Sequence, residues 1–326
     1  METIQKFKEY LEDTKIILIT THQQPDADGI GSQIALTHAL QSIGKKVVCV
    51  NEEKLTKRHQ YLDLNEIIIP YNKYMRSDAP KEFDLFIVVD TNTTDRIGTN
   101  MKKLSIKSNR ILFIDHHPCP KEVISLHCID INKCATGEII GKLIEGLGIA
   151  FTKQMALPLY SSILVDSSSF RYPKVSSGTH RLVASLMETG EIRPSWAYNQ
   201  ICGTKKISHI QLLGRVLSTA QTDRDGVIAW ITMSEEELKK FKVDQDETNA
   251  FINHLLILDH IQIACMFREQ GDYVKVSFRS ATNIDVGTMA HALGGGGHDH
   301  SAATIIKGNL QSVVKRTIFQ LTVMMK

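Results

Sequence analysis

Acidic and histidine side chains gather where predicted strands end. His22, with Asp26 and Asp28 close behind it, follows the apolar run Ile16–Thr20. The other residues of this kind end or follow three further runs: Asp90, then Asp115 with His116 and His117, and finally Asp166. One such Asp, taken alone, is more often a helix cap or a turn former. Because ligands of a doubly wound sheet bind outside the carboxyl ends of its strands, the joint pattern predicts one shared crevice.

Four carboxylates in one crevice need cations between them. Each close pair repels by about 1 kcal/mol or more, even with water-like screening. The segment His22–Ser32 contains no lysine or arginine, and neither do the runs that end at Asp90 and Asp166. Mixed carboxylate and imidazole ligands suit Mn²⁺, Mg²⁺ or another hard to borderline metal better than a closed zinc site. Two such ions about 3.5–4 Å apart would stabilise the attacking and leaving oxygens of a phosphoryl transfer.

A run of glycines near the carboxyl end is the second feature with chemical meaning. Gly294–Gly297 precedes His298. Four consecutive glycines are entropically costly, so we favour a backbone that approaches an anion closely over a flexible turn.

The elements that must position these residues indicate an α/β fold in the first half. Five apolar runs are unbroken rather than alternating, which is typical of strands buried on both faces of a parallel sheet. They are Ile16–Thr20, Val47–Val50, Leu85–Asp90, Ile111–Asp115 and Ile163–Asp166. Helical spacing and stop signals predict helices over Ser32–Ile43, Thr136–Leu147, Thr179–Thr189, Pro194–Cys202 and Ser208–Thr222.

The pattern changes after a turn at Asp223–Gly226. A strand at Val227–Thr232, a helix beginning at Ser234 and an alternating strand at Tyr273–Arg279 indicate a smaller α+β unit. We therefore expect a parallel-sheet catalytic domain over residues 1–200, a helical linker over 201–224 and an α+β substrate-binding domain over 225–326.

Composition excludes several classes of protein. The 326 residues are 42% hydrophobic with a net charge of +2, which excludes wholesale disorder and argues against binding of long duplex nucleic acid. No apolar run reaches the roughly 20 residues that span a bilayer, and the first ten residues lack the apolar core of a signal peptide. The six cysteines are dispersed and are expected to be reduced thiols. These features favour a cytoplasmic protein without membrane contact.

Four separate motifs resemble the DHH phosphoesterase superfamily in order and spacing. They are His22–Ser32 (HQQPDADGIGS), Val89–Asp90, Asp115–Pro118 (DHHP) and Ile163–Tyr172 (ILVDSSSFRY). In the second half, Val276–Ser280, Gly294–His298 and Ala302–Ala303 resemble the DHH-associated domain. The resemblance covers nearly the whole chain.

The resemblance implies a role for each residue of the crevice. Two metal ions are expected, with Mn²⁺ as the favoured metal, and one would be bound by His22, Asp26 and Asp90. The other would be bound by Asp28, Asp90, His116 and Asp166, with Asp90 as the bridge. His117 would face the scissile phosphate as a phosphate contact or a proton donor, and Asp115 would orient it rather than bind metal.

The resemblance also implies a clamp on the far end of the substrate. Its expected members are Arg279 with Gly294, Gly295, Gly296, Gly297 and His298; Arg268, Asn283 and Arg171 are further candidates. Relatives usually carry a glycine after the two alanines, whereas this chain has Thr304, so the loop geometry near residue 303 stays open.

Within the superfamily, the two-domain layout resembles the nanoRNA exonucleases. We therefore expect a Mn²⁺-dependent hydrolase of short linear oligoribonucleotides and of 3′-phosphoadenosine 5′-phosphate (pAp). A phosphodiesterase for cyclic di-AMP would use the same chemistry and stays open. A third alternative, a nucleotide-binding regulatory module without turnover, conflicts with the complete set of ligands. The resemblance further leads us to expect a homodimer.

Overall fold

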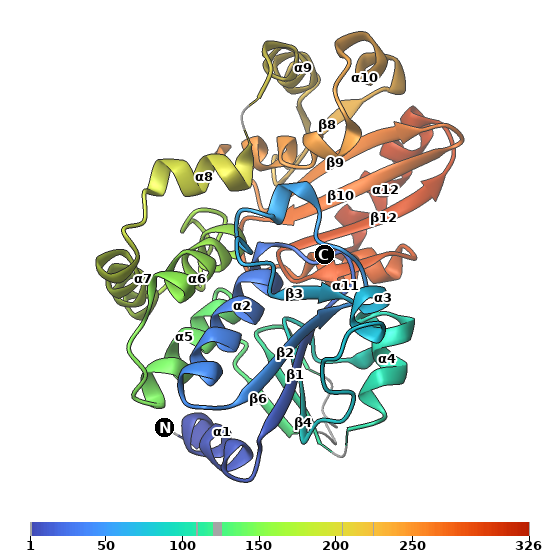
Figure 1. Ribbon diagram of the computed structural model, residues 1–326. Helices are drawn as coiled ribbons and strands as arrows, with labels where there is room; N and C mark the ends of the chain where they lie inside the picture. Colours follow the sequence, from blue (N-terminus) through green and yellow to red (C-terminus); the bar gives the residue numbers. More distant parts are fainter. Residues whose placement is uncertain (1, 109, 120–125, 204, 224, 326) are drawn as a thin grey trace. The chain divides into compact units, whose positions relative to one another are not determined.

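The computed structural model describes residues 2–108, 110–119, 126–203, 205–223 and 225–325, and only the backbone of residues 2, 190, 202, 246 and 298. The chain divides into two compact units, Met1–Thr204 and Lys205–Lys326. Each unit contains a six-stranded sheet of its own (Figure 1).

The sheet of the first unit is parallel, as predicted. Its strands are β1 (Ile16–Thr21), β2 (Lys46–Asn51), β3 (Ile68–Pro70), β4 (Leu85–Val89), β5 (Ile111–Asp115) and β6 (Leu126–Ile129). They lie in the order β3-β2-β1-β4-β5-β6, and the pairs between them are parallel. The order reverses between β1 and β4, which is where doubly wound sheets bind their ligands.

Helices cover both faces of this sheet, which explains the unbroken apolar strands. Alternate strand residues such as Ile17 and Leu18 belong to opposite cores. One face packs against α1 (Glu2–Glu12), α2 (Ala27–Ser42), α5 (Thr136–Gly146) and α6 (Lys153–Asp166), and the other against α3 (Tyr71–Met75) and α4 (Thr99–Ser105) (Figure 1). The unit is completed by α7 (Ser177–Gly190), α8 (Pro194–Cys202) and the 3₁₀ helices η1 (Lys57–His59) and η2 (Thr94–Arg96).

Two elements of the first unit differ from the sequence prediction. The run Ile163–Asp166 is the last turn of α6 and not a strand. Because nearly all of α6 from Met155 to Leu164 is buried, the helix lacks the polar face that would reveal its period. The helix predicted from Ser32 begins earlier, at Ala27, because the Asp26 side chain caps its first turn.

The second unit is a mixed-sheet α+β structure, as predicted. Its strands are β7 (Gln221–Thr222), β8 (Ile228–Met233), β9 (Ile263–Gln270), β10 (Tyr273–Ser280), β11 (Gly296–His298) and β12 (Ser301–Lys307), in the order β11-β12-β10-β9-β8-β7. The β8–β9 pair is parallel and the other described pairs are antiparallel. The helix predicted over Ser208–Thr222 is shorter, because α9 (Ile207–Leu217) ends before β7 begins.

Helices also pack on both faces of the second sheet. The helices α11 (Val286–Ala292) and α12 (Leu310–Met324) cover one face. The other face packs against α9, α10 (Glu235–Phe241) and the 3₁₀ helix η4 (Phe251–Ile257), with η3 (Gln245–Thr248) nearby in sequence. The predicted start of α10 at Ser234 is confirmed, because Ser234 and Glu237 form a capping box there.

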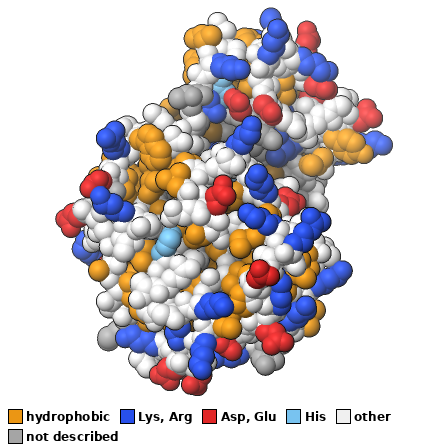
Figure 2. All heavy atoms as spheres, in the orientation of Figure 1, with side chains coloured by type: hydrophobic (Ala, Val, Ile, Leu, Met, Phe, Trp, Pro, Cys, Tyr) orange, Lys and Arg blue, Asp and Glu red, His pale blue; other side chains and the backbone are white. Residues whose placement is uncertain are grey.

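The surface agrees with the small net charge. Lys and Arg side chains are interspersed with Asp and Glu over the face shown in Figure 2. Within the described part of the chain, no helix combines the length and hydropathy that a membrane span requires. The five cysteines whose side chains are described are free thiols; that of Cys202 lies outside the described residues.

Candidate metal centre

The predicted site residues come from three neighbouring strands and two helices. His22 follows β1, Asp90 follows β4, and Asp115 is the last residue of β5. Because β1, β4 and β5 are adjacent and parallel, their carboxyl ends lie along one edge of the sheet. Asp28 lies in the first turn of α2, and Asp166 is the last residue of α6.

These side chains form three overlapping groups with the geometry of metal sites. In each group the ligand atoms lie within 4.8 Å of one another. The groups are His22, Asp26 and Asp90; Asp28, His116 and Asp166; and Asp90, His116 and His117. Asp90 and His116 each belong to two groups, so the structure brings all six predicted metal ligands into one continuous cluster.

Asp166 reaches the cluster from a helix end rather than from the predicted strand end. Its Oδ2 lies 2.9 Å from His116 Nε2. After one further residue, Ser168, Ser169 and Phe170 have φ values of 50°, 60° and 64°. Three consecutive left-handed residues are costly for L-amino acids. They end α6 abruptly and leave the Asp166 carboxylate at its tip.

Asp26 and Asp90 combine a backbone role with a place in the cluster. Asp26 Oδ1 caps α2 by accepting hydrogen bonds from the backbone nitrogens of Asp28 (2.9 Å) and Gly29 (3.3 Å). Asp90 has a left-handed φ of 62°, which Asp tolerates better than most residues. A Cβ atom on Gly29 would lie 2.3 Å from Thr21 Oγ1 and 3.2 Å from Asp90 Oδ2, so only glycine allows this close approach.

Two histidines direct the same ring nitrogen at the carboxylates. His22 Nδ1 lies 2.8 Å from the Gln23 carbonyl oxygen, and His116 Nδ1 lies 3.2 Å from that of Lys133. Because a carbonyl oxygen can only accept, Nδ1 carries a proton in both rings. The Nε2 atoms face the cluster, that of His22 at 3.3 Å from Asp90 Oδ2. This is the usual arrangement of a metal-binding imidazole.

The electrostatics of the cluster favour a cation. Burial, followed by the charge of Asp166, raises the pKa of Asp28 to about 6. Burial and the charge of Asp28 raise the pKa of Asp90 well above its ordinary value. Burial alone would lower the pKa of His116, but its interactions with Asp166, Asp28 and Asp90 raise it to about 10. A proton on His116 partly balances the carboxylates here, and the oxygen and imidazole donors fit a divalent ion in the same role.

Asp115 lies behind the cluster and contacts His117. Its Oδ1 is 2.6 Å from His117 Nδ1. Burial would raise the pKa of Asp115, but the hydrogen bond and charge of His117 outweigh burial and lower the pKa below its ordinary value. The carboxylate therefore contacts the His117 ring, and its orienting role stays a prediction.

Two hydroxyl residues contact the carboxylates, and the sequence did not single them out. Thr136, the first residue of α5, donates from Oγ1 to Asp90 Oδ1 (3.1 Å), and Ser162 on α6 donates to Asp28 Oδ1 (2.5 Å). The four-residue spacing between Ser162 and Asp166 could have signalled a shared helix face, had the segment been recognised as a helix.

Arg171 forms hydrogen bonds within the turn that follows α6. Its Nε donates to the Ser168 carbonyl oxygen (2.8 Å), and one terminal nitrogen donates to Ser168 Oγ (3.0 Å). The side chain is exposed. Part of its hydrogen-bonding capacity therefore supports the left-handed turn beside Asp166.

The predicted glycine loop is a tight hairpin with β12 in the second unit. A Cβ atom on Gly295 would lie 2.2 Å from the Ala303 carbonyl oxygen, and one on Gly297 would lie 2.4 Å from Ala302 Cα. Close backbone packing therefore requires glycine at both positions. The departure at Thr304 also has a structural role, because its Oγ1 donates to the Leu293 carbonyl oxygen (2.9 Å) at the base of the loop.

The remaining substrate candidates of the second unit differ in exposure. Arg279 on β10 is half-buried and Asn283 is exposed. The side chain of His298 lies outside the described residues. Arg268 on β9 is 1% exposed, and its Nη1 donates to Thr248 Oγ1 (2.9 Å) in η3. This burial argues against a substrate contact by Arg268.

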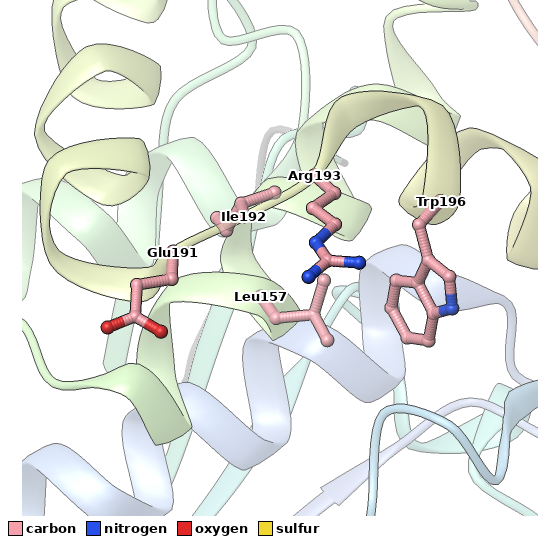
Figure 3. A pocket seen from close by; sticks show the side chains of 5 residues that line it. All are labelled: Leu157, Glu191, Ile192, Arg193 and Trp196. Carbon is pink, nitrogen blue, oxygen red and sulfur yellow. The ribbon is translucent and has the colours of Figure 1, made fainter.

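A shallow cavity of about 240 Å³ lies elsewhere on the first unit (Figure 3). It is lined by Leu157, Glu191, Ile192, Arg193 and Trp196. Glu191 forms an ion pair with Lys153 (2.6 Å), and the cavity includes none of the predicted site residues.

Comparisons with known proteins agree with both halves of the chain. Residues 16–163 match the model of the DHH family, N-terminal domain, and residues 226–320 match that of the DHHA1 domain. The probable bifunctional oligoribonuclease and PAP phosphatase NrnA of Streptococcus mutans is 30% identical over 300 residues, which are 90% of this chain and 89% of that protein. The chain belongs to the DHH family.

Two further proteins resemble this DHH-family chain over most of their length. The bifunctional oligoribonuclease and PAP phosphatase NrnA of Thermus thermophilus is 26% identical over 297 residues, covering 90% of this chain and 84% of that protein. The crystal structure of an exopolyphosphatase-related protein from Bacteroides fragilis is 25% identical with a TM-score of 0.86, covering 98% and 96% of the two chains. With its buried His and Asp groups, this DHH-family chain is a phosphoesterase that resembles NrnA.

Proposed function

We propose that this chain is a two-metal phosphoesterase that hydrolyses short oligoribonucleotides to mononucleotides and pAp to AMP. The observation that carries the proposal is the overlap of the His and Asp groups through Asp90 and His116. The names of the relatives from Streptococcus mutans and Thermus thermophilus support the substrate class.

Six residues would hold the two ions. His22 and Asp26 would bind one, and Asp28, His116 and Asp166 the other, with Asp90 shared between them. The oxygen-rich ligand set supports Mn²⁺ as the working metal. When bound, the ions would activate water and neutralise charge on the phosphate oxygens.

His117 would act on the phosphate from beside the cluster. Its Nδ1 faces Asp115, and its Nε2 would act on a phosphate oxygen or a leaving oxygen. With its ring held by Asp115, it would move a proton at Nε2 or donate a hydrogen bond from there.

The remaining candidates would contact the rest of the nucleotide. In the second unit these are Arg279, Asn283 and the loop of Gly294, Gly295, Gly296, Gly297 and His298. In that loop a Cβ atom on Gly294 would meet no atom within 4 Å and one on Gly296 none closer than 3.8 Å, so a ligand has room to approach the backbone at both positions. Arg171 would contribute from the first unit.

Product analysis with purified protein and Mn²⁺ tests the proposal. The substrates are pApA, an RNA pentamer, pAp and cyclic di-AMP, assayed side by side. Rapid loss of the linear species and pAp with slow loss of the cyclic one supports the proposal. Preferential loss of cyclic di-AMP would replace it with a cyclic dinucleotide phosphodiesterase, and loss of none would favour a binding module. The expected homodimer stays a prediction, which sedimentation of the same sample tests.

A further inference from the structure

The Asp28 carboxylate is held by four donors on both of its oxygens. Oδ2 accepts from the backbone nitrogen of Thr136 (2.8 Å). Oδ1 accepts from the backbone nitrogen of Gly137 (3.0 Å), from Ser162 Oγ (2.5 Å) and from Ser32 Oγ (3.4 Å). Asp28 is completely buried, so these contacts fix the carboxylate in one orientation.

Ser162 is the donor that ties this carboxylate to α6. It is fully buried and lies four residues before Asp166, on the same side of the helix. A single helix therefore supplies both a donor to Asp28 and the Asp166 carboxylate that faces His116. The spacing makes the positions of the two carboxylates depend on each other.

Gly137 permits this arrangement. A Cβ atom at position 137 would lie 1.9 Å from Ser162 Oγ. With glycine there, the Gly137 nitrogen and the Ser162 hydroxyl both reach Oδ1 of Asp28. At this point of contact, α5 and α6 therefore both donate to the Asp28 carboxylate.

Thr136 contacts two carboxylates, that of Asp28 and that of Asp90. Its backbone nitrogen donates to Asp28, while its Oγ1 donates to Asp90 Oδ1 at 3.1 Å. Asp90 belongs to two of the three metal-type groups, whereas Asp28 belongs to one. The hydroxyl of Thr136 and that of Ser162 therefore orient carboxylates that serve different parts of the cluster.

We infer that Ser162 and Thr136 are positioning residues that act on the two metal positions unequally. Ser162 sets the affinity of the position formed with Asp28, His116 and Asp166. The Thr136 hydroxyl sets the affinity of both positions, because it orients the shared Asp90. This inference rests on the proposed two-metal function.

The chain offers a closely matched control for Ser162. Ser161 is the preceding residue of α6 and is also fully buried, and its hydroxyl has no hydrogen-bond partner among the described residues. Ser161→Ala and Ser162→Ala therefore remove the same atom from the same helix, and only the second removes a contact with Asp28.

Calorimetric titration of the metal-free full-length protein with Mn²⁺ alone tests the inference. Ser162→Ala should weaken one of two binding events by about 10- to 100-fold and leave the other unchanged. Ser161→Ala should leave both unchanged. Thr136→Val should weaken both events, and Thr136→Ser, which keeps a hydroxyl, should restore them. Circular dichroism of each metal-free variant verifies its fold.

The outcomes separate this inference from the proposed function. If the unaltered chain binds no Mn²⁺, the two-metal function itself fails. If it binds two ions and Ser162→Ala titrates like Ser161→Ala, or weakens both events equally, the inference fails while the function stands. Should Ser162→Ala not fold, the Thr136→Val and Thr136→Ser pair decides, because equal titrations of those two variants would overturn the inference.

Discussion

Asp115 Oδ1 lies 2.6 Å from His117 Nδ1 and 2.9 Å from the backbone nitrogen of His116. One carboxylate oxygen therefore orients the ring of one histidine and the main chain of its neighbour. Asp115 belongs to none of the three metal-type groups found among the described residues. On the proposed function it would act on the chemistry through the histidines.

Asp115→Asn should lower kcat by about 10- to 100-fold, because the His117 ring loses its charged partner. Mn²⁺ affinity should change little. Steady-state hydrolysis of pApA, with calorimetry for the metal, measures both. Asp95→Asn, which changes an exposed aspartate outside the cluster, is the control. A variant with normal kcat and weakened metal binding would contradict the orienting role.

Asp90→Asn should abolish hydrolysis, by at least about 10³-fold, because the carboxylate shared by both ions is lost. It suits the site better than Asp90→Ala, since Asn tolerates the left-handed φ of 62° and alanine does not. In the metal-free state, the free energy of unfolding of the Ala variant should be about 1 kcal/mol lower than that of the Asn variant, as measured by thermal unfolding. Retained turnover in the Asn variant would exclude a two-metal mechanism built on Asp90.

Mn²⁺ binding at pH 7.5 should release at least one proton. The pKa of His116 is raised to about 10 in the metal-free cluster, so its ring is protonated at this pH and must lose that proton to bind metal. Binding should weaken further as the pH falls through about 6, where Asp28 also begins to hold a proton. Calorimetry in buffers of different ionisation enthalpy measures the release, and His116→Gln should lower it by about one proton. Heats that do not depend on the buffer would contradict the prediction.

Arg268→Met should lower the stability of the protein, whereas Arg279→Met should weaken substrate binding. Arg268 is buried and hydrogen-bonded to η3, so its loss should destabilise the protein by about 2–3 kcal/mol. Arg279 is half-buried on β10, so its loss should raise the KM for pApA roughly tenfold with little change in stability. Urea unfolding and initial rates separate the two. A stable Arg268→Met variant with a raised KM would return Arg268 to the substrate surface.

The fold could be predicted wherever the apolar residues of a segment recur at helical or strand spacing, or form one unbroken run. β1, β4 and β5 are buried on both faces, and their apolar runs mark them directly. A similar run over Ile163–Asp166 predicts a strand, and this prediction is wrong. A buried helix and a buried strand are equally apolar over four residues. Tertiary packing of α6 decided between them.

The proposed metal ligands of the candidate site could be predicted from the sequence, but the residues that donate hydrogen bonds to them could not. Asp90 and Asp115 adjoin strands in the sequence, so their convergence follows from the topology of the sheet. The donors to Asp28 could not be found in this way. Thr136 and Ser162 lie 108 and 134 residues from Asp28, and their proximity arises only when α5 and α6 pack against α2.

That separation also gives the site an order of assembly during translation. His22, Asp26 and Asp90 are made early and adjoin β1 and β4, which pair directly. Asp28 lacks its α6 donor, and the second group lacks Asp166, until the chain has been made through α6. Under the proposed two-metal function, a chain stopped before α6 would hold the ligands of one ion and lack a ligand of the other. Packing of α6 against α2 would supply both the missing ligand, Asp166, and the missing donor, Ser162.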